Sequence, residues 1–133
     1  MDLTVTGVIV CGKRMGRLLG FPTANLEPSD PGAPLPENGV YIGQIRLEGA
    51  NEPWRICVVN HGMQPTLPSG RRTIEAHILD FDHDVYGLRA QLRFLRYLRP
   101  EQKFDTGEQL RAQLERDVQA ARAFAQARAA QTI

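Results

Sequence analysis

The sequence has 133 residues, the length of one domain with a hydrophobic core of its own. Hydrophobic residues make up 42% of it and charged residues 23%, which is ordinary globular usage and argues against disorder. Its formal net charge is +1, with acids and bases interspersed, so it lacks the clustered basic face that nucleic-acid-binding proteins usually carry. We predict a single domain over residues 1–133, in which the Ala-rich segment from about residue 122 to 133 forms a frayed tail.

Nothing in the sequence indicates secretion or membrane insertion. The N-terminus has no basic and apolar leader, and the apolar runs are far shorter than the roughly 20 residues of a membrane-spanning helix. Cys11 and Cys57 lie in apolar, strand-like runs, which favours buried free thiols over a disulfide. The histidines and cysteines do not show the spacing of a metal site. We therefore expect a cytoplasmic protein with no membrane partner.

The first three quarters of the chain predict β structure. Residues 3–11 are rich in β-branched side chains and predict the first strand. Further strands are predicted at residues 39–47, 54–60, 73–79 and 88–94, of which the last two alternate between apolar and polar positions. A Gly-punctuated loop at residues 12–25, a Pro-rich stretch at 27–38 and a second loop at 61–71 separate them.

The pattern becomes helical after Pro100. Either Asp105-x-x-Glu108 or Thr106-x-x-Gln109 can close a capping box, and both alternatives stay open. Apolar residues then recur with helical spacing at positions 110, 114, 118 and 121. At least five strands followed by one helix predict a mainly β fold, an antiparallel barrel or sandwich with a C-terminal helix packed against it.

The loop at residues 12–25 is a candidate phosphate-binding element. Glycines at positions 12, 16 and 20 allow backbone N–H groups to turn toward an anion, and the cations between them would neutralise its charge. A glycine-rich hairpin loop with solvated charges would have the same pattern. Behind the rigid Pro22, however, Thr23 and Asn25 offer a hydroxyl and an amide oxygen two residues apart, and magnesium prefers such oxygen donors.

Glu75 lies in the middle of a predicted strand, on the face opposite the apolar residues Ile74 and Ala76. A solvated strand position is one interpretation. The other is a general base, because a carboxylate accepts a hydroxyl proton during phosphoryl transfer. We expect Glu75 to point into the opening of the barrel together with Thr73 and His77.

Several motifs together resemble the signature of the ATP-dependent riboflavin kinases (flavokinases). They are Gly7-Val8, Gly12, residues 16–25 (GRLLGFPTAN), 38–41 (NGVY), 60–62 (NHG), Pro65-Thr66, 74–81 (IEAHILDF), Tyr86-Gly87 and 98–104 (LRPEQKF), with Leu110 and Asp117 in the helix. The match runs in order over nearly the whole chain, and residues 16–25 followed by 74–81 are highly specific. His61 and Leu67 depart from the family pattern, which usually has an aliphatic residue and Phe there, and both are expected to flank the nucleotide.

The resemblance implies a six-stranded antiparallel Greek-key barrel with a C-terminal helix, and an enzyme that phosphorylates riboflavin. Glu75 would be the catalytic base, and Thr23 and Asn25 would hold the metal, which is magnesium with zinc or manganese as alternatives. The residues implied to bind ATP or the flavin are Gly12, Lys13, Gly16, Arg17, Gly20, Phe21, Pro22, Thr23, Asn25, Asn60, Arg99 and Phe104. The glycine-rich loop would form a flap over ATP, and Arg99 and Phe104 would belong to a second flap near the flavin.

Two alternatives to this enzyme remain. One is a flavin- or nucleotide-binding regulatory module on the same barrel, although a pure binder has no need of the base Glu75. The other is a small nucleic-acid-binding barrel, which we disfavour because no aromatic residues interleave with Arg89, Arg93 and Arg96. We expect a monomer whose partners are riboflavin, FMN, ATP and ADP. FMN rather than FAD is the expected product, because the adenylyltransferase domain often found in bacterial members is not part of this sequence.

Overall fold

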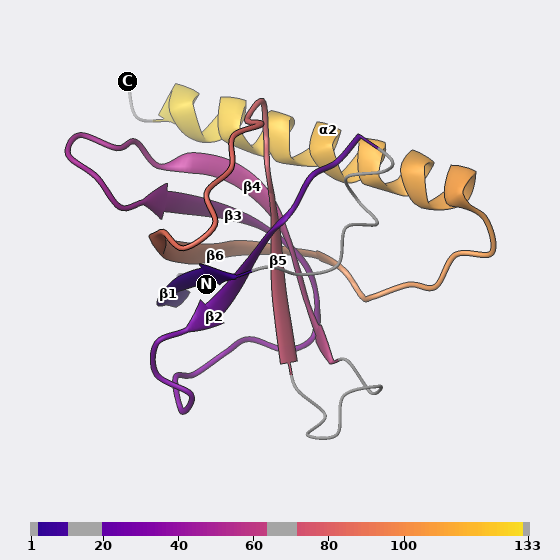
Figure 1. The fold of residues 1–133 in the computed structure, drawn as a ribbon. Helices are drawn as coiled ribbons and strands as arrows, with labels where there is room; N and C mark the ends of the chain where they lie inside the picture. The colour runs from indigo at the N-terminus through magenta and orange to yellow at the C-terminus, as the bar shows by residue number, and fades with distance from the viewer. Residues whose placement is uncertain (1–2, 11–19, 64–71, 132–133) are drawn as a thin grey trace.

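In the part of the chain that the structure describes, six strands form a closed antiparallel barrel, and helix α2 lies on its outer side (Figure 1). The computed structural model describes residues 3–10, 20–63 and 72–131. In these ranges the elements are β1 (Leu3–Val10), β2 (Ala24–Pro28), β3 (Gly39–Leu47), β4 (Arg55–Met63), β5 (Arg72–Ile78), β6 (Arg89–Arg99) and α2 (Gly107–Gln131). Around the barrel the strand order is β1-β2-β5-β4-β3-β6. Consecutive β3, β4 and β5 pair as neighbours and β6 returns beside β3, which is a Greek key. The predicted fold class is confirmed.

The strand boundaries differ from the sequence prediction in three places. β2 lies in a region predicted as loop, because a Pro-rich stretch obscured a five-residue strand that ends at Pro28. β4 continues to Met63 and so includes His61, which the sequence assigned to a loop. β6 continues to Arg99 instead of residue 94, since a shift in its pairing with β3 interrupts the alternation that the prediction relied on.

The barrel interior is filled by apolar side chains. As predicted, the inward-facing residues of β5 and β6 are buried: Ile74, Ala76, Ile78, Ala90, Leu92 and Phe94. Cys57 is a buried free thiol, also as predicted, and burial raises its pKa, whereas Cys11 lies outside the described residues. His61 is fully buried beside Phe94, with ring centroids 6.3 Å apart. His61 therefore faces the core. Its expected position beside the nucleotide stays a prediction, and Leu67 lies outside the described residues.

Helix α2 begins with a cap in one of the two predicted registers. Thr106 Oγ1 accepts the N–H of Gln109 at 3.2 Å, and Gln109 Oε1 accepts the N–H of Asp105 at 3.1 Å. The helix then covers the outer face of β3 and β4, where it completes a second apolar cluster made of Val40, Ile42, Val58 and Ala121. It extends to Gln131 through most of the segment predicted to fray, because Ala-rich sequence has high helix propensity and Phe124 packs on this cluster.

An ion pair joins α2 to the end of β6. Arg99 donates from Nε and Nη2 to the two carboxylate oxygens of Asp117, at 3.0 and 2.8 Å, and Gln113 donates to the same carboxylate at 3.0 Å. Asp117 is 3% exposed, so its charge depends on these partners. Within the described ranges, no helix combines the length and apolar character needed to cross a membrane.

Replacing Asp117 should destabilise the fold far more than replacing an exposed neighbour. Asp117→Ala leaves the Arg99 guanidinium without its partner, which should lower the free energy of unfolding by about 3 kcal/mol. Glu115→Ala, in the same helix, removes the exposed pair with Arg111 and should cost about 0.5 kcal/mol or less. Urea denaturation of both variants measures this difference. Equal small losses would show that the Arg99–Asp117 pair does not hold α2 on the barrel.

Candidate functional site

Three polar side chains form a row across neighbouring strands on the outer wall of the barrel. Asn25 of β2 lies opposite Glu75 of β5, and Glu75 lies opposite Asn60 of β4. Opposite residues of an antiparallel pair point to the same face. Because Ile74 and Ala76 point into the core, Asn25, Glu75 and Asn60 point outward, and we call them the polar row. The prediction that Glu75 faces away from the core is confirmed. The predicted position in the barrel opening is wrong, since the row lies on the wall.

Asn25 carries an acceptor that none of the described residues engages. Its Oδ1 is buried and has no hydrogen-bond partner among the described residues. A buried unpaired acceptor costs stability, so its persistence points to a ligand that supplies the missing partner. Thr23, two residues earlier, is exposed and adds a hydroxyl. Two neutral oxygen donors fit magnesium, which keeps several waters and binds substrate phosphates.

The turn that leads into β2 is held against β5. Gly20 has a φ of 86°, a conformation that favours glycine, and the half-buried Phe21 and Pro22 follow it. The ring of Phe21 packs edge-to-face on His77, with centroids 5.4 Å apart, and His77 Nδ1 lies 2.8 Å from the Pro22 carbonyl oxygen. This turn therefore adjoins the polar row through β5, the strand that carries Glu75.

The segment after β6 covers another side of the row. A side chain at Gly62, two residues beyond Asn60 in β4, would collide with the carboxylate of Glu101. The absence of a side chain at Gly62 thus leaves room for the Glu101 carboxylate to lie against the strand. The backbone of Arg99 is opposite Val40, which is itself opposite Asn60, but the Arg99 guanidinium turns away to Asp117. Phe104 is half-buried in the segment between β6 and α2.

The predicted site residues therefore fall into three groups. Gly20, Phe21, Pro22, Thr23, Asn25, Asn60 and Glu75 are brought together on β2, β4, β5 and the turn before β2. Arg99 and Phe104 belong to the end of β6 and the segment after it, and the guanidinium of Arg99 is engaged with the helix. Gly12, Lys13, Gly16 and Arg17 lie outside the described residues. His77, Glu101 and Asp117 stand in the family motifs quoted above, but no role was predicted for any of the three. The placement of His77 two residues after Glu75 on the same strand face is a further signal.

A metal at this site would rely on few protein ligands. Over residues 3–10, 20–63 and 72–131, no group of three or more His, Cys, Asp or Glu side chains is arranged to hold a metal ion. A dedicated cage of the zinc or calcium type is therefore not formed by these residues. The oxygen donors there are those of Asn25, Glu75 and Asn60 in the row, together with the hydroxyl of Thr23 before β2.

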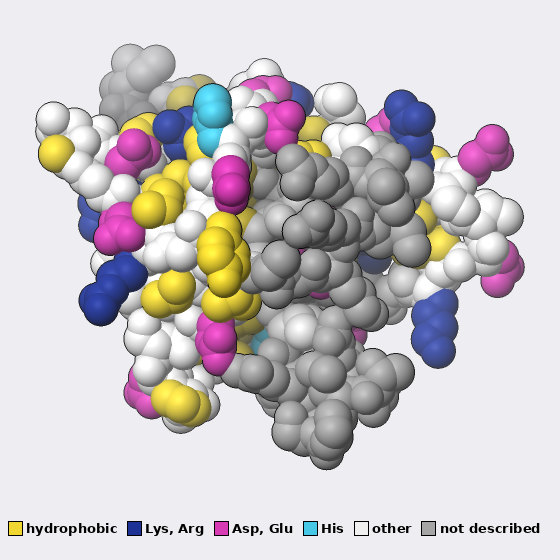
Figure 2. All heavy atoms as spheres, in the orientation of Figure 1, with side chains coloured by type: hydrophobic (Ala, Val, Ile, Leu, Met, Phe, Trp, Pro, Cys, Tyr) yellow, Lys and Arg dark blue, Asp and Glu magenta, His cyan; other side chains and the backbone are white. Residues whose placement is uncertain are grey.

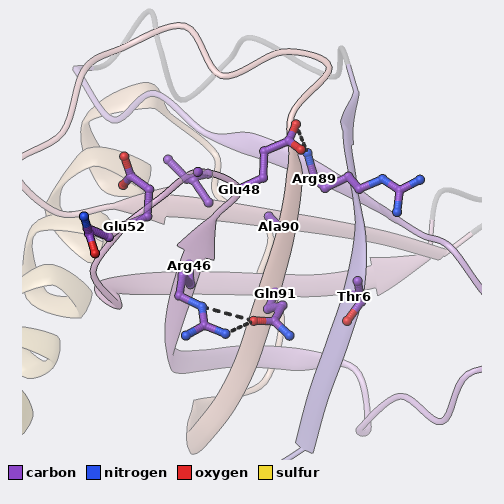
Figure 3. Close-up of a pocket in the computed structure, with 10 residues that line it drawn as sticks. Thr6, Arg46, Glu48, Glu52, Arg89, Ala90 and Gln91 are labelled. Atoms are coloured by element: carbon purple, nitrogen blue, oxygen red, sulfur yellow. Dashed lines mark hydrogen bonds between the residues drawn. The ribbon is translucent and has the colours of Figure 1, made fainter.

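A separate hollow of about 450 Å³ lies on the opposite half of the barrel wall (Figure 3). Its floor includes Thr6, Gln91 and Arg46, which lie opposite one another on β1, β6 and β3. The Arg46 guanidinium donates twice to Gln91 Oε1, at 3.1 and 2.5 Å, and Glu48 accepts the backbone N–H of Arg89 at 3.0 Å (Figure 3). Glu52 Oε2 also lines the hollow and has no hydrogen-bond partner among the described residues, but it lies 3.6 Å from Arg55 Nη2 in an ion pair. Since these polar groups are engaged with one another, the hollow is a weaker site candidate than the polar row.

Aromatic rings do contact arginines on this half of the wall, which the sequence did not reveal. The guanidinium carbons of Arg46 and Arg93 lie 4.8 and 3.9 Å from the centroid of the Trp54 ring. The prediction was that no aromatic residues interleave with Arg89, Arg93 and Arg96, but the Trp54 ring does contact Arg93. The guanidinium groups, however, occupy the ring that a base would need for stacking. Among the described side chains visible in Figure 2, charges of both signs are interspersed and form no single basic patch.

Comparisons with known proteins agree on one family. The family model Flavokinase, described as riboflavin kinase, matches residues 1–125. A bifunctional riboflavin kinase/FMN adenylyltransferase of Listeria monocytogenes is 36% identical over 122 residues, which cover 91% of this chain and 38% of that protein. An RNA-binding riboflavin kinase of Bacillus subtilis is 37% identical over 115 residues, 86% of this chain and 47% of that protein.

A solved structure has a similar fold. A crystal structure described as a macrolide-efflux protein from Streptococcus pneumoniae matches with a TM-score of 0.82 and 30% identity, covering 91% of this chain and 38% of that one. Like the Listeria enzyme, it is much longer than the part that this chain matches. The chain thus spans about two fifths of the length of its first curated relative.

Removing the unpaired amide oxygen of Asn25 should not weaken the free protein. Asn25→Val eliminates a buried unpaired acceptor and adds a residue that favours strands, so the free energy of unfolding should stay unchanged or rise by about 1 kcal/mol. Chemical denaturation without ligand measures it. A loss of more than about 1 kcal/mol would show that the amide stabilises the free fold, which would remove the argument for a ligand at Oδ1.

Proposed function

This chain belongs to the riboflavin kinase family, and we propose that it transfers the γ-phosphate of ATP to the ribityl 5′-hydroxyl of riboflavin, giving FMN and ADP. The observation that carries this proposal is the polar row. It combines a carboxylate, Glu75, with the unused amide oxygen of Asn25 on the adjacent strand. Phosphoryl transfer needs a proton acceptor and oxygen ligands for a magnesium–nucleotide complex at neighbouring points, and the row supplies both.

In the proposed mechanism, Glu75 takes the proton of the ribityl 5′-hydroxyl. The hydroxyl oxygen bonds to the γ-phosphorus at the same time, and ADP departs. A rigid strand keeps this carboxylate at a fixed distance from the nucleotide ligands, which suits a general base. Thr23 and Asn25 would hold magnesium, with zinc or manganese as alternatives. When bound, the metal neutralises charge on the phosphate oxygens. Asn60, on the other side of Glu75, would orient the phosphates or the base.

The remaining predicted ligands belong to the same proposal. Gly12, Lys13, Gly16, Arg17 and Gly20 would cover the ATP phosphates, and Phe104 would contact the flavin. For Arg99 the proposed role is indirect, because its guanidinium is committed to Asp117. It would fix the start of the segment that carries Glu101 and Phe104 beside the polar row.

The setting of the reaction is also part of the proposal. We expect the chain to act in the cytoplasm as a monomer on small molecules. RNA binding is named for the Bacillus subtilis relative, and the engaged Trp54 and scattered charges described above do not favour it here. A regulatory module that binds without catalysis is the second candidate, and the retained carboxylate of Glu75 disfavours it.

Replacing the base should separate enzyme from binder. With riboflavin, ATP and magnesium, the wild-type chain should accumulate FMN and no FAD on chromatography. Glu75→Gln keeps the shape but cannot accept the proton, so turnover should fall by about 10²–10⁴-fold. The KM values should change little, since the lost interaction belongs to the transfer step. Glu48→Gln, a carboxylate on the opposite half of the wall, is the matched control. Absence of FMN with wild type would favour the binding module, and a fully active Glu75→Gln would require another base.

Removing either proposed metal ligand should weaken nucleotide binding without unfolding the protein. Thr23→Ala and Asn25→Ala should each lower the affinity for a magnesium complex of a non-hydrolysable ATP analogue by about tenfold or more, because each loses one oxygen contact. Titration calorimetry measures the affinity. Thr6→Ala, an exposed threonine in the opposite hollow, should bind as wild type does. Unchanged affinity in both site variants would mean that the ligands are misassigned.

A further inference from the structure

His77 makes a contact that ties two parts of the site together. Its Nδ1 lies 2.8 Å from the carbonyl oxygen of Pro22, and its ring meets the edge of Phe21 at an interplanar angle of 68°. A carbonyl oxygen only accepts hydrogen bonds, so Nδ1 must carry the proton and donate it. The contact therefore fixes the protonation of the imidazole at Nδ1 as well as its orientation.

The position of this bond explains what it does. β2 pairs with β5 at Ala24–Ala76 and Asn25–Glu75, so the next pair in this register would be Thr23 and His77. Strand β2 begins only at Ala24, and Pro22 has no N–H with which to extend the pairing. Instead, the side chain of His77 on β5 bonds to the carbonyl oxygen of Pro22, the residue before Thr23. Thr23 is thereby fastened on both sides, by the strand pairing after it and by His77 before it.

His77 is also on the right face for this task. It lies two residues after Glu75 on β5, so both side chains point to the outer wall. One strand thus carries the proposed base and the group that holds the turn before β2. Thr23 itself is exposed and lies outside the strand. Without the His77 contact, only the local backbone would determine the position of its hydroxyl.

We propose that His77 is a positioning residue, which holds the Pro22 carbonyl and so keeps the Thr23 hydroxyl beside the Asn25 amide oxygen for the magnesium–nucleotide complex. This inference rests on the proposed function, because it assigns His77 a role toward the nucleotide ligands Thr23 and Asn25. It assigns His77 no contact with riboflavin or the transferred phosphate. The nucleotide end of the reaction should therefore depend on His77, and the flavin end should not.

The kinetic test compares two substitutions. His77→Leu removes the donor, and the KM for magnesium–ATP should rise by about 3–10-fold, the effect of one hydrogen bond, while the KM for riboflavin stays unchanged. His77→Asn places an amide N–H where Nδ1 stood and should recover most of the loss. His83→Leu, an exposed histidine in the segment after β5, is the control and should match wild type. A wild-type KM in His77→Leu, or equal impairment of the Leu and Asn variants, would overturn the role of the bond.

A spectroscopic test does not depend on activity. In protein labelled with ¹⁵N at histidine, the Nδ1 of His77 should show the chemical shift of a protonated ring nitrogen at a pH where the imidazole is neutral. A shift that places the proton on Nε2 would exclude donation to Pro22 and overturn the inference.

The failure of this inference differs from the failure of the proposed function. Wild type without kinase activity, or normal nucleotide binding by both Thr23→Ala and Asn25→Ala, would overturn the proposed function, and with it the role of His77. Weakened binding by those two variants together with a normal His77→Leu would overturn the role of His77 alone.

Discussion

The candidate site depends on the register in which β5 pairs with β2 on one side and β4 on the other. That register aligns Asn25, Glu75 and Asn60 across three strands. Because side chains alternate along a strand, a slip of one residue would turn Glu75 into the core and expose Ile74 or Ala76 to water. The apolar interior therefore fixes the position of the polar row. Packing of the core and placement of the proposed base are two consequences of one alternating pattern.

Two glycines let neighbouring segments lie close to the barrel strands, and these segments form the surroundings of the polar row. A side chain at Gly7 of β1 would collide with the Glu27 carbonyl of β2, so glycine there allows β2 to enter the barrel. At Gly62 the missing side chain leaves room for Glu101. Helix α2 then holds the segment that carries Glu101, because its Asp117 binds Arg99 at the end of β6. Elements far apart in sequence thus meet around three strands.

Local pattern was sufficient to predict five strands, the outward direction of Glu75 and the start of the helix. It failed for β2, because five residues that end at a proline carry too short a pattern to identify a strand. It also failed wherever two distant segments touch. The guanidinium of Arg99 could not be assigned to Asp117, nor the ring of Trp54 to Arg93, without the barrel topology. The unused oxygen of Asn25 is likewise a property of packing, which sequence does not display.

The central claim is that the nucleotide binds at the polar row and not in the hollow on the opposite half of the barrel wall. Adding a manganese–ADP complex to ¹⁵N-labelled protein tests it directly, since the paramagnetic ion broadens the NMR signals of nearby nuclei. The side-chain amide signals of Asn25 and Asn60 should broaden, while that of Gln91, which lines the hollow, should stay sharp. Broadening of the Gln91 signal with sharp Asn25 and Asn60 signals would contradict the account.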